Sequence, residues 1–219
     1  MAWRAASEAE DDDLIALFRN HQVIMCPTLV AWDRLGRILD RSLHQDERRQ
    51  WVHPVHRDIW QRYLRREGAP HRRWRFQAAI PHLKRFMARA HAQGVVTALG
   101  TDTPFHYLIS GFSVHDELAM YVDAGLRPLA ALTAATTVNA NVLGIGERVG
   151  HLATGFIADQ VAIQGNPLQR IDDISNVRCT VHAVHIFTPT DLLPTVQRTV
   201  DRQPDDATTR DLLNYVNSE

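Results

Sequence analysis

The sequence predicts an α/β fold with parallel strands in its first part, followed by a small antiparallel region. Two short apolar runs, residues 23–25 and 95–99, have the character of buried strands, and a long helical pattern separates them. After Gly144 the pattern changes to short alternating segments divided by glycine and proline turns, which are typical of antiparallel strands. We therefore expect a strand–helix region (1–143), a β region (144–188) and a polar helical tail (189–219).

The first helix and the first strand are expected in residues 7–25. Residues 7–21 start with a serine that can cap a helix and an acidic first turn, and apolar residues then recur at helical spacing. Residues 23–25 form a brief apolar run, and Pro27 cannot continue a central ladder. A short buried strand that leads into a loop is therefore expected.

The next segment, residues 33–91, has a helical pattern that is interrupted near Pro54, residues 68–70 and Pro81. It is rich in arginine, so a phosphate-binding surface is one interpretation. Acidic residues are interspersed at spacings that suit solvated helix faces, namely Glu47, Asp58 and Glu67. We favour the interpretation that these arginines lie on solvated helix faces.

The second strand, residues 95–99, follows a helix that ends at Gly94. Residues 113–124 then predict an amphipathic helix with Ser113 as its cap and Gly125 as its stop. Residues 127–145 continue as helices of small side chains that can pack closely. Alternating segments within 146–167 and 177–187 are the expected antiparallel strands.

Composition indicates a soluble globular protein, with 45% apolar residues, 22% charged residues and a formal net charge of −1. This balance gives no general attraction to nucleic acid or to anionic membranes. Cys26 and Cys179 fit no metal-binding or redox spacing, and neither is a good nucleophile candidate. Without a spanning segment or a secretory signal at its start, the chain is expected to be cytoplasmic.

The candidate catalytic residue is Asp102, which follows the second predicted strand between two threonines. Taken alone, it is equally a turn aspartate of the kind that often ends strands. His106 follows four residues later and is the histidine we place nearest to this site, toward substrate, although a plain loop histidine is as good an interpretation.

Two other histidine pairs are separated by two residues each. His53 and His56 flank Pro54 among arginines, which favours a surface helix. His182 and His185 lie in an alternating segment, where an odd separation directs side chains to opposite faces of a strand. On this interpretation the second pair cannot form one site.

Three segments occur in a characteristic order: GVVTALGTDTP (94–104), HDELAMYVDAGLRPLAALTAATTVNANVLGI (115–145) and GHLATGFIADQVAIQGNPL (150–168). In this order and spacing the chain resembles the C-terminal part of metal-dependent amidohydrolases, in the imidazolonepropionase-like and prolidase-like branch. VIMCPTL (23–29) is similar to the preceding strand of that family.

The resemblance implies the C-terminal part of a distorted (β/α)8 TIM-type barrel followed by a small β-sandwich segment. Residues 23–25 and 95–99 would match the last two barrel strands, and residues 150–184 part of the sandwich. It also implies metal-dependent hydrolysis of C–N bonds in a small amide, cyclic amide or dipeptide, with a divalent metal, zinc. Asp102 would bind the metal and handle the proton of the attacking metal-bound water. Glu117 matches the Glu-Leu helix of the family and is expected to orient or cap.

The sequence also departs from the family pattern. It contains no His-x-His, and the chain starts just downstream of where the Glu-His pair of the family would fall. The resemblance therefore implies that about six strands and most metal ligands are absent. Gln160 and Gln164 replace an apolar and an acidic residue, and the helices expected between Ala31 and Ala92 have no detailed counterpart in the pattern.

Three hypotheses follow from these observations. The first is an amidohydrolase part that is active only with a missing N-terminal half and has little activity and weak metal binding alone. The second is a non-catalytic remnant that acts as an interaction module or self-associates through unpaired strand edges. The third and weakest is an arginine-mediated nucleic-acid binder, which no motif in the sequence supports.

Overall fold

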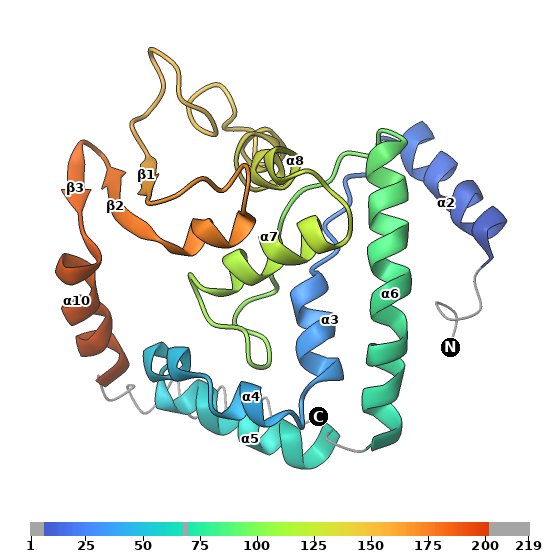
Figure 1. Ribbon diagram of the computed structural model, residues 1–219, viewed down its shortest axis with the longest axis horizontal. Coiled ribbons are helices and arrows are strands. Elements are labelled where there is room, and N and C mark those ends of the chain that lie inside the picture. The colour runs from blue at the N-terminus through green and yellow to red at the C-terminus, as the bar shows by residue number, and fades with distance from the viewer. Residues whose placement is uncertain (1–6, 68–69, 202–219) are drawn as a thin grey trace.

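A computed structural model describes residues 7–67 and 70–201 of the chain, and helices make up most of it. The longest helix, α6, stands between α2 and α3, and α7 lies on the other side of α3 (Figure 1). In chain order the helices are α2 (Glu8–Asn20), α3 (Leu29–Gly36), α4 (Arg41–His44), η1 (Glu47–Trp51), α5 (Pro54–Glu67), α6 (Pro70–Ala92), α7 (Ser113–Asp123), α8 (Pro128–Thr133), η2 (Ala134–Val138), α9 (Asn139–Val142), η3 (Ile171–Ser175) and α10 (Pro189–Asp201).

The two predicted strands lie side by side and run parallel, as expected, but Val23 and Ile24 are exposed, so that only Met25 of the first run is buried. Their pairing consists of one bridge between Met25 and Thr97. The Met25 N–H donates to the Val96 carbonyl over 2.9 Å, and the Ala98 N–H donates to the Met25 carbonyl over 2.9 Å. The carboxyl ends of both segments therefore lie at the same edge, where the loops that precede α3 and α7 begin.

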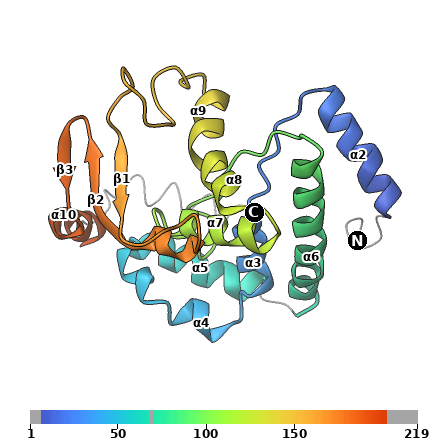
Figure 2. The ribbon, with the colours of Figure 1, turned by 45° about the horizontal axis from the view of Figure 1, so that its top comes forward.

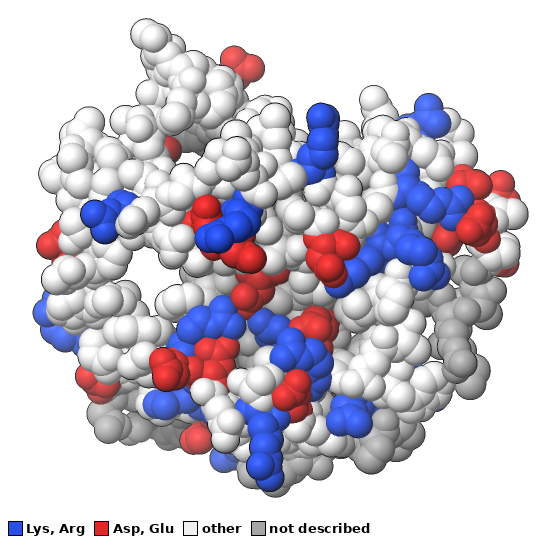
Figure 3. Space-filling view, in the orientation of Figure 1, with Lys and Arg blue, Asp and Glu red and all other residues white. Residues whose placement is uncertain are grey.

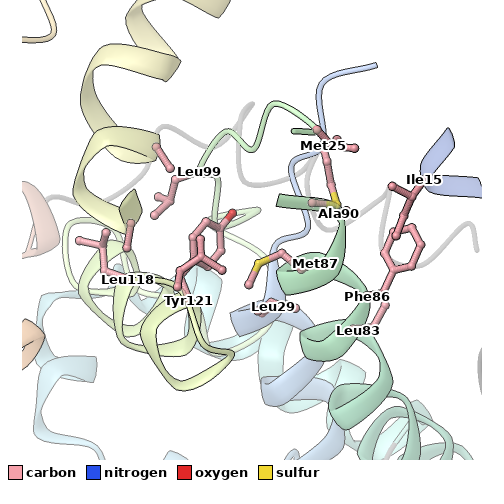
Figure 4. Close-up of a cluster of buried hydrophobic side chains, with 14 of the residues drawn as sticks. Ile15, Met25, Leu29, Leu83, Phe86, Met87, Ala90, Leu99, Leu118 and Tyr121 are labelled. Carbon is pink, nitrogen blue, oxygen red and sulfur yellow. The ribbon is translucent and has the colours of Figure 1, made fainter. Parts of the chain in front are cut away.

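The main core is built around these two segments by side chains from α2, α3, α6 and α7. Figure 4 shows Met25 and Leu99 from the paired segments, Met87 and Phe86 from α6, and Tyr121 from α7 converging in one cluster. Burial of these apolar side chains is the main stabilising contribution. Because Met25 and Leu99 are part of this core, packing fixes the position of the loops that follow them.

A three-stranded antiparallel sheet in the order β1-β2-β3 lies on the side of α7 that faces away from α3 and α6 (Figures 1 and 2). Its strands are β1 (Gln160–Ile163), β2 (Val177–His182) and β3 (His185–Phe187). The predicted antiparallel character of this region is confirmed. The alternating pattern predicted strand structure from residue 146 onward, but β1 begins only at Gln160, and residues 146–157 form no strand.

Helix α2 begins as predicted, and α6 does not break where expected. Ser7 caps α2 in a reciprocal capping box with Glu10. The predicted interruption at Pro81 is wrong, because α6 continues through it. Pro81 is exposed, so its ring lies on the outer side of the helix, and the helix lacks only the hydrogen bond that a residue with an N–H would donate at this position.

The start of helix α7 differs from the prediction, and its end agrees with it. The predicted Ser113 cap is wrong, because Ser113 is already helical and its hydroxyl accepts from the Ile109 N–H over 2.8 Å. The stop at Gly125 is confirmed by its φ of 110°, a left-handed conformation that favours glycine, and the Leu126 N–H closes the end on the Tyr121 carbonyl.

The predicted C-terminal helix is confirmed as α10, while its continuation in residues 202–219 lies outside the described residues. Among the described residues, no helix combines the length and apolar character needed to cross a bilayer. Parallel and antiparallel elements together give the expected α/β character. The described residues contain one parallel bridge and one antiparallel sheet, so they do not themselves close a barrel.

Candidate active site

Asp102 lies at the carboxyl end of the paired segments, in the turn that follows Leu99. It is exposed, and its φ of 62° places it in the left-handed region, which aspartate tolerates better than most residues. The Asp102 carbonyl accepts from the Phe105 N–H over 2.9 Å, so the backbone turns back at this point. The hydroxyls of Thr101 and Thr103, on either side of Asp102 in the sequence, bond to each other over 2.7 Å.

Cys26 ends the neighbouring segment and lies close to Asp102. Gly100 permits this approach, because a Cβ at that position would lie 2.6 Å from the Cys26 Sγ. Burial raises the pKa of the Cys26 thiol, and the carboxylates of Glu117 and Asp102 raise it further. A thiol with a raised pKa is a poor nucleophile, in agreement with the interpretation of the sequence.

Glu117 is fully buried in α7 and caps the start of α3. Its two carboxylate oxygens accept from the Leu29 N–H over 2.8 Å and from the Val30 N–H over 2.6 Å. Thr28, the residue before the helix, has a left-handed conformation and provides no side-chain cap. Burial raises the pKa of Glu117 to about 7, while the two backbone N–H groups act to lower it. The expected orienting role of Glu117 agrees with this geometry.

Two further side chains hold the second segment in place. Asn139 donates to the Leu99 carbonyl over 2.8 Å and accepts from the Leu99 N–H over 3.0 Å, as a neighbouring strand would. The Tyr121 hydroxyl donates to the Ala98 carbonyl over 2.8 Å. Together they fix the backbone that immediately precedes Asp102.

His106 is buried beneath α5. Its ring stacks on Tyr63 with a centroid distance of 3.4 Å and lies against Phe105 at 4.1 Å. The Trp60 indole N–H of the same helix donates to the Pro104 carbonyl over 3.4 Å. Helix α5 therefore covers the loop after Asp102.

The ligands expected for a metal centre do not come together here. Within residues 7–67 and 70–201, no group of three or more His, Cys, Asp or Glu side chains is placed to hold a metal ion. Both oxygens of Glu117 are occupied by backbone N–H groups. Since a catalytic zinc site needs about three protein ligands, Asp102 and its described neighbours do not fit such a metal by themselves.

The histidine pairs differ from the predictions in one respect. His53 precedes α5 and accepts from the Val55 N–H over 3.3 Å, so it stands at the helix start. The prediction that His182 and His185 point to opposite faces is wrong, because a turn separates them and they are direct partners across β2 and β3. Cross-strand partners lie on the same face of a sheet.

Several arginines of the arginine-rich segment, residues 33–91, are paired with carboxylates. Arg34 is buried and contacts Asp33 at 2.7 Å and Asp116 at 2.6 Å, while Arg48 contacts Asp46 at 2.7 Å and Asp116 at 3.1 Å. Figure 3 shows the resulting mixture of positive and negative side chains on this face. The face has no continuous positive surface of the kind that nucleic acids require.

Comparison with known proteins decides the family. The model of the amidohydrolase family matches residues 57–187, which is more than half of the chain. The chain belongs to the amidohydrolase family. The matched range contains Asp102, Glu117 and Asn139, and it also includes residues 57–91, for which the sequence pattern suggests no counterpart. No curated protein matches this amidohydrolase-family chain.

Solved structures show the same fold. Bottromycin amidohydrolase matches with a TM-score of 0.62 and 24% identity over 83% of this chain and 41% of its own. A Xaa-Pro dipeptidase with bound methionine matches with a TM-score of 0.58 and 21% identity over 80% and 37%. A prolidase complexed with N-methylphosphonate-L-proline matches with a TM-score of 0.56 and 22% identity, over 84% of this chain and 38% of its own. The chain therefore spans roughly two fifths of these structures.

Proposed function

We propose that this chain forms the C-terminal part of the active site of a metal-dependent amidohydrolase that cleaves C–N bonds in small amides, cyclic amides or dipeptides. The observation that carries the proposal is the position of Asp102 at the carboxyl end of a parallel strand pair, in a chain that belongs to the amidohydrolase family. Active groups of such barrels lie at this end of the strands.

Asp102 is proposed as one ligand of a divalent metal, zinc, whose other ligands come from outside the described residues. One carboxylate does not hold a catalytic metal, so the chain by itself is expected to bind zinc weakly and to have little hydrolase activity. His106, the proposed substrate-side residue, is buried against Tyr63. It would therefore act by shaping the loop 103–108 that faces the substrate.

Complementation tests this proposal. The chain is produced alone and together with the N-terminal part of a prolidase-like relative, and hydrolysis of a Xaa-Pro dipeptide is measured with added Zn²⁺. We expect hydrolysis only in the combined sample, and we expect Asp102→Asn to abolish it without preventing association of the two parts. Hydrolysis that persists in Asp102→Asn would contradict the assigned role.

Metal analysis of the chain alone provides an independent check. After gel filtration in the presence of Zn²⁺, we expect Asp102→Asn to retain the same amount of zinc as the parent, because zinc held at surface histidines does not depend on Asp102. One retained zinc that is lost in Asp102→Asn would show that the site is more complete than we propose.

The second candidate is an interaction module without catalytic function, which one observation favours. Val23, Ile24 and Val96 flank the parallel bridge and are 38%, 45% and 48% exposed. Apolar side chains beside an unpaired strand edge favour association with another chain. Complementation distinguishes the two candidates, because a module would bind the N-terminal part without restoring hydrolysis.

A further inference from the structure

Two histidine rings share one end of the three-stranded sheet. His182 and His185 are the last paired residues of the β2–β3 hairpin and lie directly opposite each other in the register. Opposed residues on one face have Cβ atoms about 4.5–5.5 Å apart, which lets two imidazole rings approach a common point. The hairpin end lies at the left-hand side of the molecule (Figures 1 and 2), and both histidines are exposed.

Hydrogen bonds fix the protonation of the Nδ1 atom in both rings. The His182 Nδ1 lies 2.8 Å from the Asp159 Oδ1, and the His185 Nδ1 lies 3.0 Å from the Ala183 carbonyl oxygen. A carboxylate and a carbonyl only accept, so each Nδ1 must carry the hydrogen and donate it. In the neutral rings the lone pair is therefore on Nε2, and none of the described residues donates a hydrogen bond to either Nε2.

The same carboxylate also holds the turn. The Asp159 Oδ1 accepts from the Ala183 N–H over 3.3 Å, so Asp159 restrains the hairpin backbone and the His182 ring together. Metal-binding histidines commonly donate their other ring N–H to a carboxylate or to a backbone carbonyl, which fixes the tautomer and the orientation of the ring. His182 has the first arrangement and His185 has the second.

We propose that His182 and His185 form a surface site for a borderline divalent cation, such as Zn²⁺, Ni²⁺ or Cu²⁺, bound through the Nε2 atoms of both rings. Imidazole nitrogen suits these cations and does not suit Mg²⁺. Water fills the other coordination positions, because the described residues offer no third ligand. Asp159 is a positioning residue of this site. The proposal does not depend on Asp102 or on hydrolase activity.

Calorimetric titration of the untagged full chain with Ni²⁺ at pH 8 tests the site. We expect one binding event that His182→Gln and His185→Gln each weaken at least tenfold. The double variant should be no weaker than either single variant, because loss of one ring already removes the chelate. His21→Gln replaces an exposed histidine at the end of α2 and should leave the affinity unchanged.

Further measurements distinguish the two metal-binding histidines from Asp159, which positions one of them. Long-range ¹H–¹⁵N NMR of the imidazole rings should show the Nδ1–H tautomer for His182 in the parent, and Asp159→Asn should reduce its population and weaken Ni²⁺ binding. Mg²⁺ should not bind, and Asp102→Asn should bind Ni²⁺ like the parent, so this proposal and the proposed hydrolase can fail separately. Ni²⁺ affinity that is unchanged in either histidine variant would overturn the two-histidine site.

Discussion

Glu117 illustrates at the scale of one residue how the candidate site depends on buried polar contacts. Its carboxylate takes the place of the missing side-chain cap at the start of α3. The loop that carries Cys26 leads directly into that helix. A single side chain from α7 therefore positions the loop at the end of the first strand segment.

Replacing Glu117 with Gln should destabilise the chain by about 2 kcal/mol at pH 5, because an amide NH₂ group would face a backbone N–H donor. The pKa of Glu117 is raised to about 7 from 4.5. Between these values the folded chain binds more protons than the unfolded chain, so the stability of the parent falls as the pH rises. Urea unfolding between pH 4 and 8 should show the difference between parent and variant narrowing across this window. A difference that is independent of pH would contradict the raised pKa.

Asn139 is expected to stabilise the fold, because its side chain bonds to the backbone of Leu99 as a neighbouring strand would. Asn139→Ala removes both hydrogen bonds to Leu99, and we expect a loss of about 1–3 kcal/mol in urea unfolding. Asn141→Ala is the matched control, because Asn141 is exposed in the same helix and should have little effect. Equal effects of the two substitutions would mean that the Asn139 contacts contribute nothing measurable.

At the scale of elements, α6 organises the helices around the paired segments. One of its faces contributes Phe86, Met87 and Ala90 to the core, and Phe18 of α2 meets Phe86 edge-on at 6.1 Å. This packing explains why a proline at an exposed position does not interrupt the helix. Tertiary burial outweighs the local preference.

Pro81→Ala should therefore stabilise the chain by about 1–3 kcal/mol, since it restores an N–H donor within α6 without removing a core contact. Thermal unfolding should show a higher midpoint. Pro194→Ala in α10 offers a comparison at another exposed proline within a helix. A lower midpoint for Pro81→Ala would indicate that the local geometry at Pro81 is needed for packing against α3.

Local patterns predicted those elements whose cause is local. The capping box at Ser7, the glycine stop at Gly125 and the two apolar runs are each encoded within a few residues. The parallel pairing of those runs also followed from their character. In contrast, the β2–β3 turn consists of Ala183 and Val184 with φ of 47° and 66°, where turns of this kind usually contain asparagine or glycine. Nothing in the local sequence indicated the turn that brings His182 and His185 together.

The candidate site was predictable only in part, for the same reason. Asp102 could be found because it directly follows a strand and belongs to an ordered set of motifs. Glu117 accepts a hydrogen bond from the Leu29 N–H, 88 positions away in the sequence, and no sequence periodicity indicates such a contact. The close approach of Gly100 to Cys26 and the contacts of Asn139 with Leu99 also depend on tertiary structure. The Glu-Leu and Asn-Ala motifs marked these positions without indicating their contacts.

At the scale of the whole molecule, the chain has a substantial helical core and an exposed apolar margin beside the parallel bridge. Val23, Ile24 and Val96 form this margin, and the paired segments have no further strand neighbour among the described residues. The family fold places strands on both sides of such segments. The margin is therefore where additional chain, or a second copy, would be accommodated.

Ile24→Lys should reduce self-association of the isolated chain, because a charge at the margin opposes pairing of strand edges. Sedimentation velocity over a range of protein concentrations should show dimers or larger species for the parent and a shift toward monomer for the variant. Leu152→Lys, at an exposed position in the 146–157 turns, serves as the control and should behave like the parent. A parent chain that stays monomeric throughout would contradict this expectation.

The Glu117 contact also bears on the order in which the chain folds. Its two hydrogen bonds close a loop of 88 residues, whereas α2 and α6 form from local contacts. Local helices are expected to form early, and the carboxylate to leave water only when α7 docks on α3. The late docking step then carries the proton uptake of folding, so folding kinetics near neutral pH should report on the formation of the candidate active-site end of the molecule.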